Sequence, residues 1–544
     1  MADNAYPVLQ LGTQAIPLQE HLTKDFAFEF ISNAAFNTAP TPPAAQPDKS
    51  DSKGEPAEKP DQPPISLWQN AGMTQLRREY ATGLFIITEG AAVLKQPDQL
   101  IGLPANTIMY DETLSLTPEI IHILDLKQAH PISLDHLDQL GEQIVLFFYP
   151  AQWGIRVPFG RIEIADGFSG SVMQQGSVGV TLKGDFGRDL QPSVYWRGSL
   201  GIGQMEAIAI SIECETAGDV EVWAKLQMVN PQNFQIAQKK LIPLSAFRDD
   251  TILDTKAGFR FVNITLMAKG NGTVKIRQVH LRRSRGKYGT MFIGGKRLKA
   301  VKPLDGELLS YFDAGDLKPP LSVYFSGYRS AEGFEGNFMM KAIRNPFLLF
   351  SDARLEGGAF YLGDPQLENQ VVEMIQATLK RLGFRPDELI LSGLSMGTLG
   401  ALYYGAKLDP RAILVGKPLI NLGTIAENGR VRRSADFATA FDMLMMFNGS
   451  ATHESAEKIN QRIWRTISGG KFDHTFFAIA HMLDDDYEHH AFDEIVKWLN
   501  RRQQHNRVLH IGLHGRHNDN TNEVNAWFLR QYHMILTQEF GRSF

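Results

Sequence analysis

From about residue 305 onward, short apolar runs alternate with longer amphipathic stretches. The apolar runs predict strands at 321–326, 346–351, 388–392, 411–416, 475–480 and 507–511. The amphipathic stretches between and after them predict helices at 366–383, 396–408, 490–504 and 522–537. Strands that alternate with helices in this way form a parallel sheet covered on both faces. We therefore predict an α/β domain over residues 305–544.

Between about 151 and 290 the hydrophobic period changes to two. The clearest run is 220–228, where valine, alanine, leucine and methionine alternate with Glu221, Trp223, Lys225 and Gln227. Runs at 178–182, 208–212 and 274–277 follow the same rule, and turns containing glycine or asparagine separate them. Several such strands in succession predict an antiparallel β-sandwich over residues 151–300.

The N-terminal part mixes short strands and helices and contains one segment of a different kind. Residues 37–64 hold eight prolines and no Ile, Leu, Val, Phe, Tyr or Trp. Such a segment buries no apolar surface, so we predict a disordered insertion. Residues 1–36 and 65–150 are then expected to form one small α/β region.

Composition narrows the function classes. The 544 residues are 43% hydrophobic with a net charge of −5, which gives no electrostatic reason to bind nucleic acid. The single cysteine, Cys214, excludes an intrachain disulfide and a cysteine-rich metal site. The N-terminus lacks the pattern of a secretory signal, and no apolar run is long enough to span a membrane. These features predict a cytoplasmic protein.

Residues 282–302 carry eight basic residues and no acidic one. Such a run is either a site for phosphate, anionic lipid or an acidic partner, or a solvated connector between domains. We favour the connector.

Four aromatic residues in the predicted sandwich suggest a second functional interpretation. Trp153, Tyr195, Trp196 and Trp223 have the side chains that stack on sugar rings in carbohydrate-binding domains. The simpler interpretation, which we favour for each of them, is a core or strand-face aromatic.

The strongest chemical signal is the sequence Gly393-Leu394-Ser395-Met396-Gly397, which follows an apolar strand and precedes a helix. This is the G-x-S-x-G nucleophile elbow in its required strand–turn–helix setting. The turn exposes the serine hydroxyl, and glycines two residues away avoid collisions with the flanking strand and helix. Ser395 is the predicted nucleophile.

A serine hydroxyl needs a base and an orienting acid, which follow it in the order Ser, acid, His in this fold. His517 lies in the loop after the last predicted strand and is the predicted base, while His514 is closer to the strand end and is assigned a structural role. The loop after strand 475–480 crowds four carboxylates into residues 484–488. We choose Glu488 as the triad acid, with Asp485 and Asp486 as the alternatives.

The oxyanion hole needs backbone N–H groups close to the nucleophile. The N–H of Met396 is one candidate, and Gly327 and Tyr328, in the loop after the first strand of the domain, supply the others. No ligand spacing of a metal site is present, and no tightly bound cofactor is expected.

Five motifs together resemble the second accessory secretory protein of the accessory Sec system of Gram-positive bacteria. They are YFSGYRSAEGFEG (324–336), DARLEGGAFYLG (352–363), LSGLSMGTLGALYYGA (391–406), VGKPLINLGT (415–424) and GRHNDNT (515–521). The motifs cover roughly residues 320–540, and the β-rich middle is compatible with the carbohydrate-binding-like domain of that family. The resemblance implies an α/β-hydrolase fold for residues 305–544.

The resemblance also implies two roles. One is a place in a complex with the first and third accessory secretory proteins, peripheral to the inner face of the membrane, which delivers a serine-rich repeat glycoprotein adhesin to a dedicated motor ATPase. The other is O-acetylation of N-acetylglucosamine on the adhesin glycans by a Ser–acid–His triad, with an acyl donor such as acetyl-CoA as co-substrate. Ser395 and His517 match the family motifs directly, and Glu488 matches by position in its loop.

Two alternatives stay open at the level of sequence. The same triad serves a carbohydrate esterase, in which water takes the acyl group in place of a sugar hydroxyl. The second alternative is a non-catalytic scaffold of the export complex, in which the triad no longer has a catalytic role.

Overall fold

The computed structural model describes residues 5–40, 66–202, 207–230, 232–254, 261–433, 439–502 and 506–543. The chain divides into two compact units. One comprises Met1–Pro150 with Asp313–Lys318, and the other comprises Ala151–Phe312 with Pro319–Phe544. Most of the predicted proline-rich insertion, residues 41–64, lies outside the described residues.

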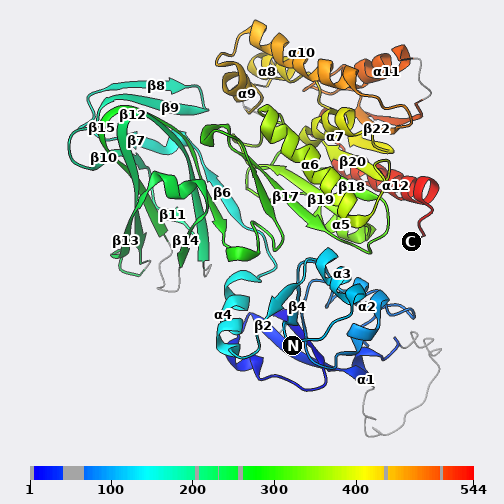
Figure 1. The fold of residues 1–544 in the computed structure, drawn as a ribbon. Coiled ribbons are helices and arrows are strands. Elements are labelled where there is room, and N and C mark those ends of the chain that lie inside the picture. Colours follow the sequence, from blue (N-terminus) through cyan, green and yellow to red (C-terminus); the bar gives the residue numbers. More distant parts are fainter. Residues whose placement is uncertain are drawn as a thin grey trace, which may run out of the picture. The chain divides into compact units, whose positions relative to one another are not determined.

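The N-terminal unit is built on a parallel sheet of order β2-β1-β3-β4-β5 (Figure 1). Its strands are β1 (Tyr6–Gly12), β2 (Phe26–Ser32), β3 (Leu84–Ile87), β4 (Ile108–Asp111) and β5 (His130–Ile132). Its helices are α1 (Asn33–Phe36), α2 (Pro97–Gly102), α3 (Pro118–Leu126) and α4 (Leu137–Phe147). All four residues of β3 are buried, which explains its uninterrupted apolar sequence.

A short segment from much later in the chain completes this unit. Residues 313–318 connect two strands of the C-terminal sheet, yet they belong to the N-terminal unit. Leu317 packs against the apolar core of this unit, and Lys127 Nζ donates to the carbonyls of Leu103 and Gly315 over 2.8 and 2.6 Å. Burial lowers the pKa of Lys127 to about 8.

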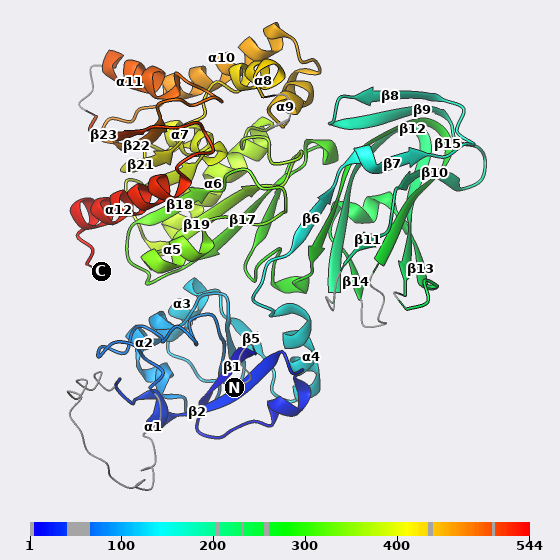
Figure 2. The same ribbon diagram turned by 180° about the vertical axis from the view of Figure 1, so that it is seen from behind.

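The β-rich middle is a single antiparallel sheet that curls around its own core (Figures 1 and 2). Its strands are β6 (Gly154–Val157), β7 (Ile162–Ile164), β8 (Ser171–Gln175), β9 (Gly179–Asp185), β10 (Gln191–Trp196), β11 (Leu200–Gly201), β12 (Ala207–Val229), β13 (Ile236–Pro243), β14 (Thr251–Asp254) and β15 (Phe261–Arg283). The separate runs predicted at 208–212 and 220–228 are the two ends of β12. The two long strands β12 and β15 pair along most of their length and hold both halves of the sheet together.

Glycines explain how both long strands bend in the same place. Gly218 of β12 and Gly270 of β15 have φ values of 90° and 91°, a region that glycine enters without steric cost. They lie at the same point of the ladder, where Gly218 pairs with Gly272 and Val220 with Gly270.

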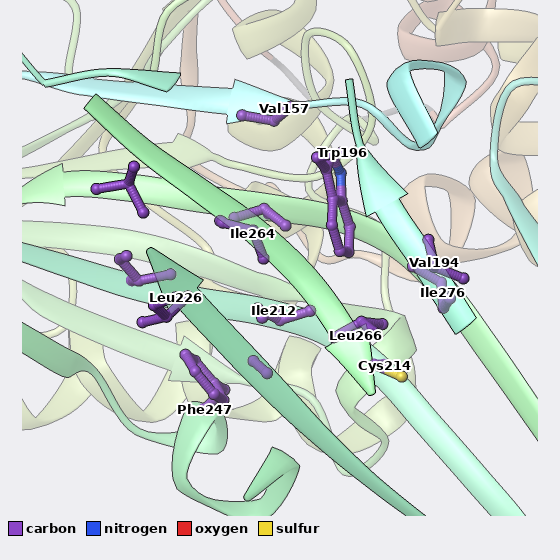
Figure 3. Packing of buried hydrophobic residues seen from close by; sticks show 14 of the residues in the cluster. Val157, Val194, Trp196, Ile212, Cys214, Leu226, Phe247, Ile264, Leu266 and Ile276 are labelled. Atoms are coloured by element: carbon purple, nitrogen blue, oxygen red, sulfur yellow. The ribbon is translucent and has the colours of Figure 1, made fainter. Parts of the chain in front are cut away.

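The core of this sheet consists of alternate residues from both halves, several of which are labelled in Figure 3. Trp196 is one of them and is only 4% exposed, in agreement with the core interpretation. Trp153 packs against the same core and is partly buried, whereas Tyr195 is 39% exposed.

The C-terminal sheet has the order β16-β17-β19-β18-β20-β21-β22-β23, and strands β18 to β23 are parallel (Figure 2). The strands are β16 (Lys296–Lys299), β17 (Glu307–Asp313), β18 (Leu321–Phe325), β19 (Phe347–Asp352), β20 (Leu389–Leu394), β21 (Ala412–Gly416), β22 (Phe476–Met482) and β23 (Val508–Leu513). The helices are α5 (Asn337–Ile343), α6 (Pro365–Leu382), α7 (Met396–Leu408), α8 (Leu422–Val431), α9 (Thr439–Asn448), α10 (His453–Gly469), α11 (Ala491–Arg501) and α12 (Thr521–Phe540). The predicted α/β class and all six predicted strands are confirmed, and β16 extends the sheet to residues before 305. Of the helices in the described part of the chain, none combines the length and the apolar character needed to cross a membrane.

Both faces of this sheet are covered, as neighbouring residues of β18 show. The Tyr324 ring meets Phe528 of α12 on one face, with centroids 6.3 Å apart. The next residue, Phe325, stacks on Tyr404 of α7 on the opposite face at 5.6 Å. Consecutive strand residues point to opposite faces, so a strand buried on both sides needs apolar residues throughout.

The basic segment 282–302 is not the solvated connector that we predicted. Arg282 is 1% exposed, and its guanidinium contacts Glu332 at 2.5 Å and Glu307 at 2.6 Å. His280 of the same strand is bound by Glu332 at Nδ1 over 2.5 Å and by Glu213 at Nε2 over 3.1 Å. Buried charges need partners of opposite charge, and here acids from distant parts of the sequence supply them. We call His280, Arg282, Glu213, Glu307 and Glu332 the junction cluster.

Candidate active site

Ser395 occupies the sharp turn between β20 and α7. Its backbone has φ 51° and ψ −119°, a conformation that non-glycine residues adopt only when the surroundings impose it. The flanking glycines are required by close packing. A Cβ atom at Gly393 would lie 2.4 Å from the backbone of Gly397, and one at Gly397 would lie 2.0 Å from the carbonyl oxygen of Phe325.

The predicted nucleophile and base lie within hydrogen-bond distance of each other. Ser395 Oγ is 2.8 Å from His517 Nε2, and His517 is only 1% exposed. His514, three residues earlier, is exposed and lies 3.7 Å from Asp484. The structure therefore brings Ser395 and His517 together, and it leaves His514 outside this arrangement.

Asp485 is the carboxylate that contacts the imidazole. Its Oδ2 lies 2.8 Å from His517 Nδ1, and its Oδ1 accepts the backbone N–H groups of Tyr487 and Glu488. Burial alone would raise the pKa of Asp485, but the hydrogen bonds from His517 and these two N–H groups hold the pKa below its ordinary value. An ionised Asp485 fixes the ring so that Nε2 faces the serine.

Our choice of Glu488 as the triad acid is corrected by this geometry. The Glu488 carboxylate accepts the backbone N–H groups of Ile420 and Asn421 at 2.6 and 3.0 Å and the Asn421 side-chain amide at 2.7 Å. It therefore binds the residues that precede α8, where a negative charge is favourable. Burial raises the pKa of Glu488 to about 7 against the effect of these donors. Its role in the structure is to anchor α8.

The sequence did not point to Tyr487 or Arg433 in the surroundings of His517, and it offered Asp486 only as an alternative triad acid. Asp486 Oδ1 accepts the backbone N–H of His517, and Asp486 Oδ2 pairs with Arg433 at 2.8 Å. The Tyr487 ring stacks on the His517 ring at 4.2 Å, and the Arg433 guanidinium lies 3.7 Å from the centre of the tyrosine ring. No sequence pattern pointed to Arg433, because it lies more than 80 residues before His517.

The three predicted oxyanion donors differ in their hydrogen bonds and positions in the structure. Met396 is the first residue of α7, so its N–H has no acceptor within the helix. Gly327 N–H donates to Glu335 Oε2 over 2.6 Å and is therefore occupied by a carboxylate, contrary to our expectation. Tyr328 and Gly327 both line the same pocket as Ser395.

The pocket in front of Ser395 has a volume of about 550 Å³. Its polar lining includes Glu335, Glu356, Lys417, Asn518 and Asn525. Lys417 Nζ donates to the carbonyl of Asp519 and to Thr521 Oγ1, and burial lowers the pKa of Lys417. Among the residues that the structure describes, no three His, Cys, Asp or Glu side chains are grouped as metal ligands.

This arrangement contains the parts that nucleophilic acyl transfer requires. A hydroxyl lies beside an imidazole, a carboxylate orients that imidazole, and the first N–H of a helix lies next to the hydroxyl. The pocket in front of these groups is large enough for an acyl group together with part of a second substrate.

Comparisons with known proteins agree with the motifs. The family described as "Accessory Sec system GspB-transporter" matches residues 8–542. The second accessory secretory protein of the accessory Sec system of Staphylococcus aureus is 38% identical over 449 residues, which are 82% of this chain and 84% of that protein. Its counterpart in Streptococcus gordonii is 38% identical over 442 residues, or 80% and 85% of the two chains. In the solved glycosylation associate protein (Gap123) complex from Streptococcus agalactiae, one chain is 31% identical with a TM-score of 0.83, and each chain is covered completely.

Proposed function

The chain belongs to the family of the second accessory secretory protein of the accessory Sec system, and from this premise we propose that it combines a part in glycoprotein export with O-acetyltransferase activity on N-acetylglucosamine. The observation that carries the enzymatic half is the chain of two 2.8 Å contacts from Ser395 through His517 to Asp485. A protein that served as a scaffold alone has no physical need for a strained serine beside a buried imidazole.

The proposed reaction has two steps. His517 Nε2 takes the proton of Ser395 Oγ as this oxygen attacks the carbonyl carbon of the acyl donor, and the protonated imidazole then gives its proton to the leaving group. In the second step a sugar hydroxyl loses its proton to His517 and attacks the acyl-serine ester, which releases Ser395. Asp485 stabilises the imidazolium in both steps, and the Met396 N–H donates to the oxyanion. The acyl donor, for instance acetyl-CoA, is a co-substrate.

The structural half of the proposal concerns partners. The Streptococcus agalactiae structure is that of a Gap123 complex, which supports assembly of this chain with the first and third accessory secretory proteins. We propose that this assembly works in the cytoplasm, peripheral to the membrane, and passes the serine-rich repeat adhesin with its glycans to the motor ATPase.

Mass spectrometry of the adhesin glycans from wild-type and Ser395→Ala cells tests the enzymatic half. Removal of the nucleophile is expected to lower acetylation by at least about 10³-fold while the adhesin is still exported. The His514→Ala variant is the control, because this exposed histidine lies outside the triad. Unchanged acetylation in the Ser395→Ala cells would favour the scaffold alternative.

Incubation of the purified protein with an acyl donor and an N-acetylglucosamine acceptor separates transferase from esterase. Transfer predicts acetylated sugar in excess of free acetate, whereas an esterase releases acetate to water and leaves the sugar unmodified.

A further inference from the structure

The loop between β19 and α6 contributes Glu356 to the lining of the Ser395 pocket, and its backbone is constrained. Leu355, Phe360 and Tyr361 all have positive φ values between 51° and 63°, which non-glycine residues adopt only under constraint. Asp352 supplies that constraint. Its carboxylate binds the Arg354 guanidinium at 2.7 and 2.8 Å and accepts the N–H groups of Ala359 and Tyr361, each at 2.9 Å. A loop held this firmly presents its remaining side chains in a fixed position.

Tyr328 lies directly on this loop. A Cβ atom at Gly357 would be 1.9 Å from Cε2 and 2.0 Å from Cδ2 of the tyrosine, so the ring rests on the glycine backbone. The residue is nevertheless 40% exposed and lines the Ser395 pocket. An aromatic ring that is supported on one side and partly open to a pocket is a platform on which a sugar ring packs.

Strand β6 also supports the platform. Arg156 Nη2 donates to the carbonyls of Arg329 and Ser330, immediately after Tyr328, and the contact with Ser330 is 3.1 Å. The N–H of Glu332 donates to the carbonyl of Gly154 over 3.1 Å. The loop that carries Tyr328 is thus fixed from the side of the curled sheet.

Glu356 provides the polar counterpart of the ring. It is exposed, lines the same pocket and lies near Tyr328, whose pKa is raised by burial and by the Glu356 charge. Glu335 adds a second carboxylate to the lining. The described lining contains one cation, Lys417, whose Nζ already donates to Asp519 and Thr521. The two carboxylates therefore favour, beside Tyr328, a neutral sugar with hydroxyl donors over an acidic sugar.

We propose that Tyr328 and Glu356 form the acceptor subsite of the enzyme and select a neutral pyranose sugar with vicinal hydroxyls over an acidic sugar. The pyranose ring packs on Tyr328, the Glu356 carboxylate accepts hydrogen bonds from its hydroxyls, and another hydroxyl of the same sugar faces the acyl group on Ser395. This inference rests on the proposed acyl transfer and adds the residues that determine which acceptor is used. In the transfer, the ester bond to Ser395 Oγ breaks as the bond to the sugar oxygen forms. The hydroxyl proton passes to His517 and then to Ser395.

Direct binding tests the subsite without any need for catalysis. Isothermal titration of the full chain with methyl β-N-acetylglucosaminide should show about 10-fold weaker binding for Tyr328→Ala than for the wild type. Tyr328→Phe should bind like the wild type, because the ring is kept. Phe338→Ala is the matched control, since this aromatic side chain is 85% exposed and does not line the pocket. Equal affinity of wild type and Tyr328→Ala would overturn the proposal.

The charge argument predicts a change of specificity that a folding defect cannot produce. With Glu356→Gln, the preference for methyl β-N-acetylglucosaminide over methyl β-glucuronide, measured as a ratio of affinities, should fall by about 10-fold or more. Glu373→Gln, an exposed glutamate on α6, should leave this ratio unchanged. An unchanged ratio in Glu356→Gln would contradict the selection against acidic sugars.

A separate measurement keeps failure of the subsite apart from failure of the proposed reaction. The burst of p-nitrophenol from p-nitrophenyl acetate reports acylation of Ser395 and requires no sugar. In Tyr328→Ala, transfer to the sugar should fall by a much larger factor than the burst. Absence of the burst in the wild type would refute the acyl-transfer proposal, while the titrations would still decide the sugar site.

Discussion

Two buried histidines of the C-terminal unit make nearly the same contact with a carboxylate and serve different purposes. His517 is bound by Asp485 at Nδ1, and its Nε2 faces the hydroxyl of Ser395. His280 is bound by Glu332 at Nδ1, but its Nε2 faces a second carboxylate, Glu213. Burial alone would lower the pKa of His280, yet the two carboxylates raise it to about 9. His280 is therefore a permanent cation at neutral pH, whereas the second nitrogen of His517 can exchange a proton with Ser395.

The comparison shows that an imidazole–carboxylate contact does not by itself identify a catalytic base. A catalytic base also needs a nucleophile at its second nitrogen and access to a pocket. His517 has both, because its Nε2 faces Ser395 and it lines the pocket. The junction cluster nevertheless supports the active site, because Glu332 lies in the loop that carries Gly327 and Tyr328. One histidine carries out the proposed chemistry, and the other holds a loop in place.

The largest effect is expected when the two histidines are replaced in turn. His517→Ala should lower the rate of acyl transfer by about 10⁴-fold, or about 5.5 kcal/mol, because no base remains for the serine proton. His280→Ala should lower the free energy of unfolding by about 3–5 kcal/mol, because it removes the buried cation between Glu213 and Glu332. Acyl-transfer rates, corrected for the folded fraction, measure the first effect, and urea unfolding curves measure the second. If folded His280→Ala lost acyl transfer while His517→Ala kept it, the comparison would be wrong.

A second pair of variants tests which carboxylate serves His517. Asp485→Asn should lower kcat by about 10³–10⁴-fold, since the amide no longer stabilises the imidazolium. Glu488→Gln should affect mainly stability, by about 1–3 kcal/mol, because its partners are the N–H groups before α8. Initial rates at saturating acyl donor measure the difference. A greater loss of kcat in Glu488→Gln than in Asp485→Asn would restore Glu488 as the triad acid.

The pH dependence of stability provides a third test. His280 has a folded-state pKa of about 9 against an ordinary value of 6.5, so its stabilising contribution is complete below about pH 6.5 and is lost as the pH rises through 9. The difference between these two pKa values corresponds to about 3 kcal/mol. Urea unfolding at pH 6, 7.5 and 9 should show this decline in the wild type. The decline should be flatter in His280→Gln, and parallel curves would refute the assignment.

The smallest effect is expected at the stacked neighbours of His517. Tyr487→Leu removes the ring that stacks on the His517 imidazole and contacts the Arg433 guanidinium. We therefore expect kcat to fall by about 3–10-fold, or about 1 kcal/mol. Tyr487→Phe keeps the stacking and should stay within about twofold of the wild type. A loss of similar size in both variants would mean that the hydroxyl, and not the ring, matters.

Patterns in the sequence predicted the parallel strands of the C-terminal sheet and two of the three triad residues. The strands, the elbow and the pairing of Ser395 with His517 follow from apolar runs, glycine spacing and chain order. The triad acid could not be chosen in this way, because four carboxylates lie within residues 484–488 and the turn at Asp485 decides which one faces His517. The burial of Arg282 was equally hidden, because Glu307 and Glu332 follow it by 25 and 50 residues.

The segment 313–318 has a consequence for synthesis of the chain on the ribosome. Domains generally fold from the N-terminus as they emerge, but the N-terminal unit lacks Gly315 and Leu317 until strand β17 has also been made. Until then the ammonium of Lys127 lacks a carbonyl partner that comes 188 residues later in the sequence. The first unit to be translated is therefore completed only after the curled sheet has been translated, and a fragment that ends at residue 150 is an unfinished folding unit.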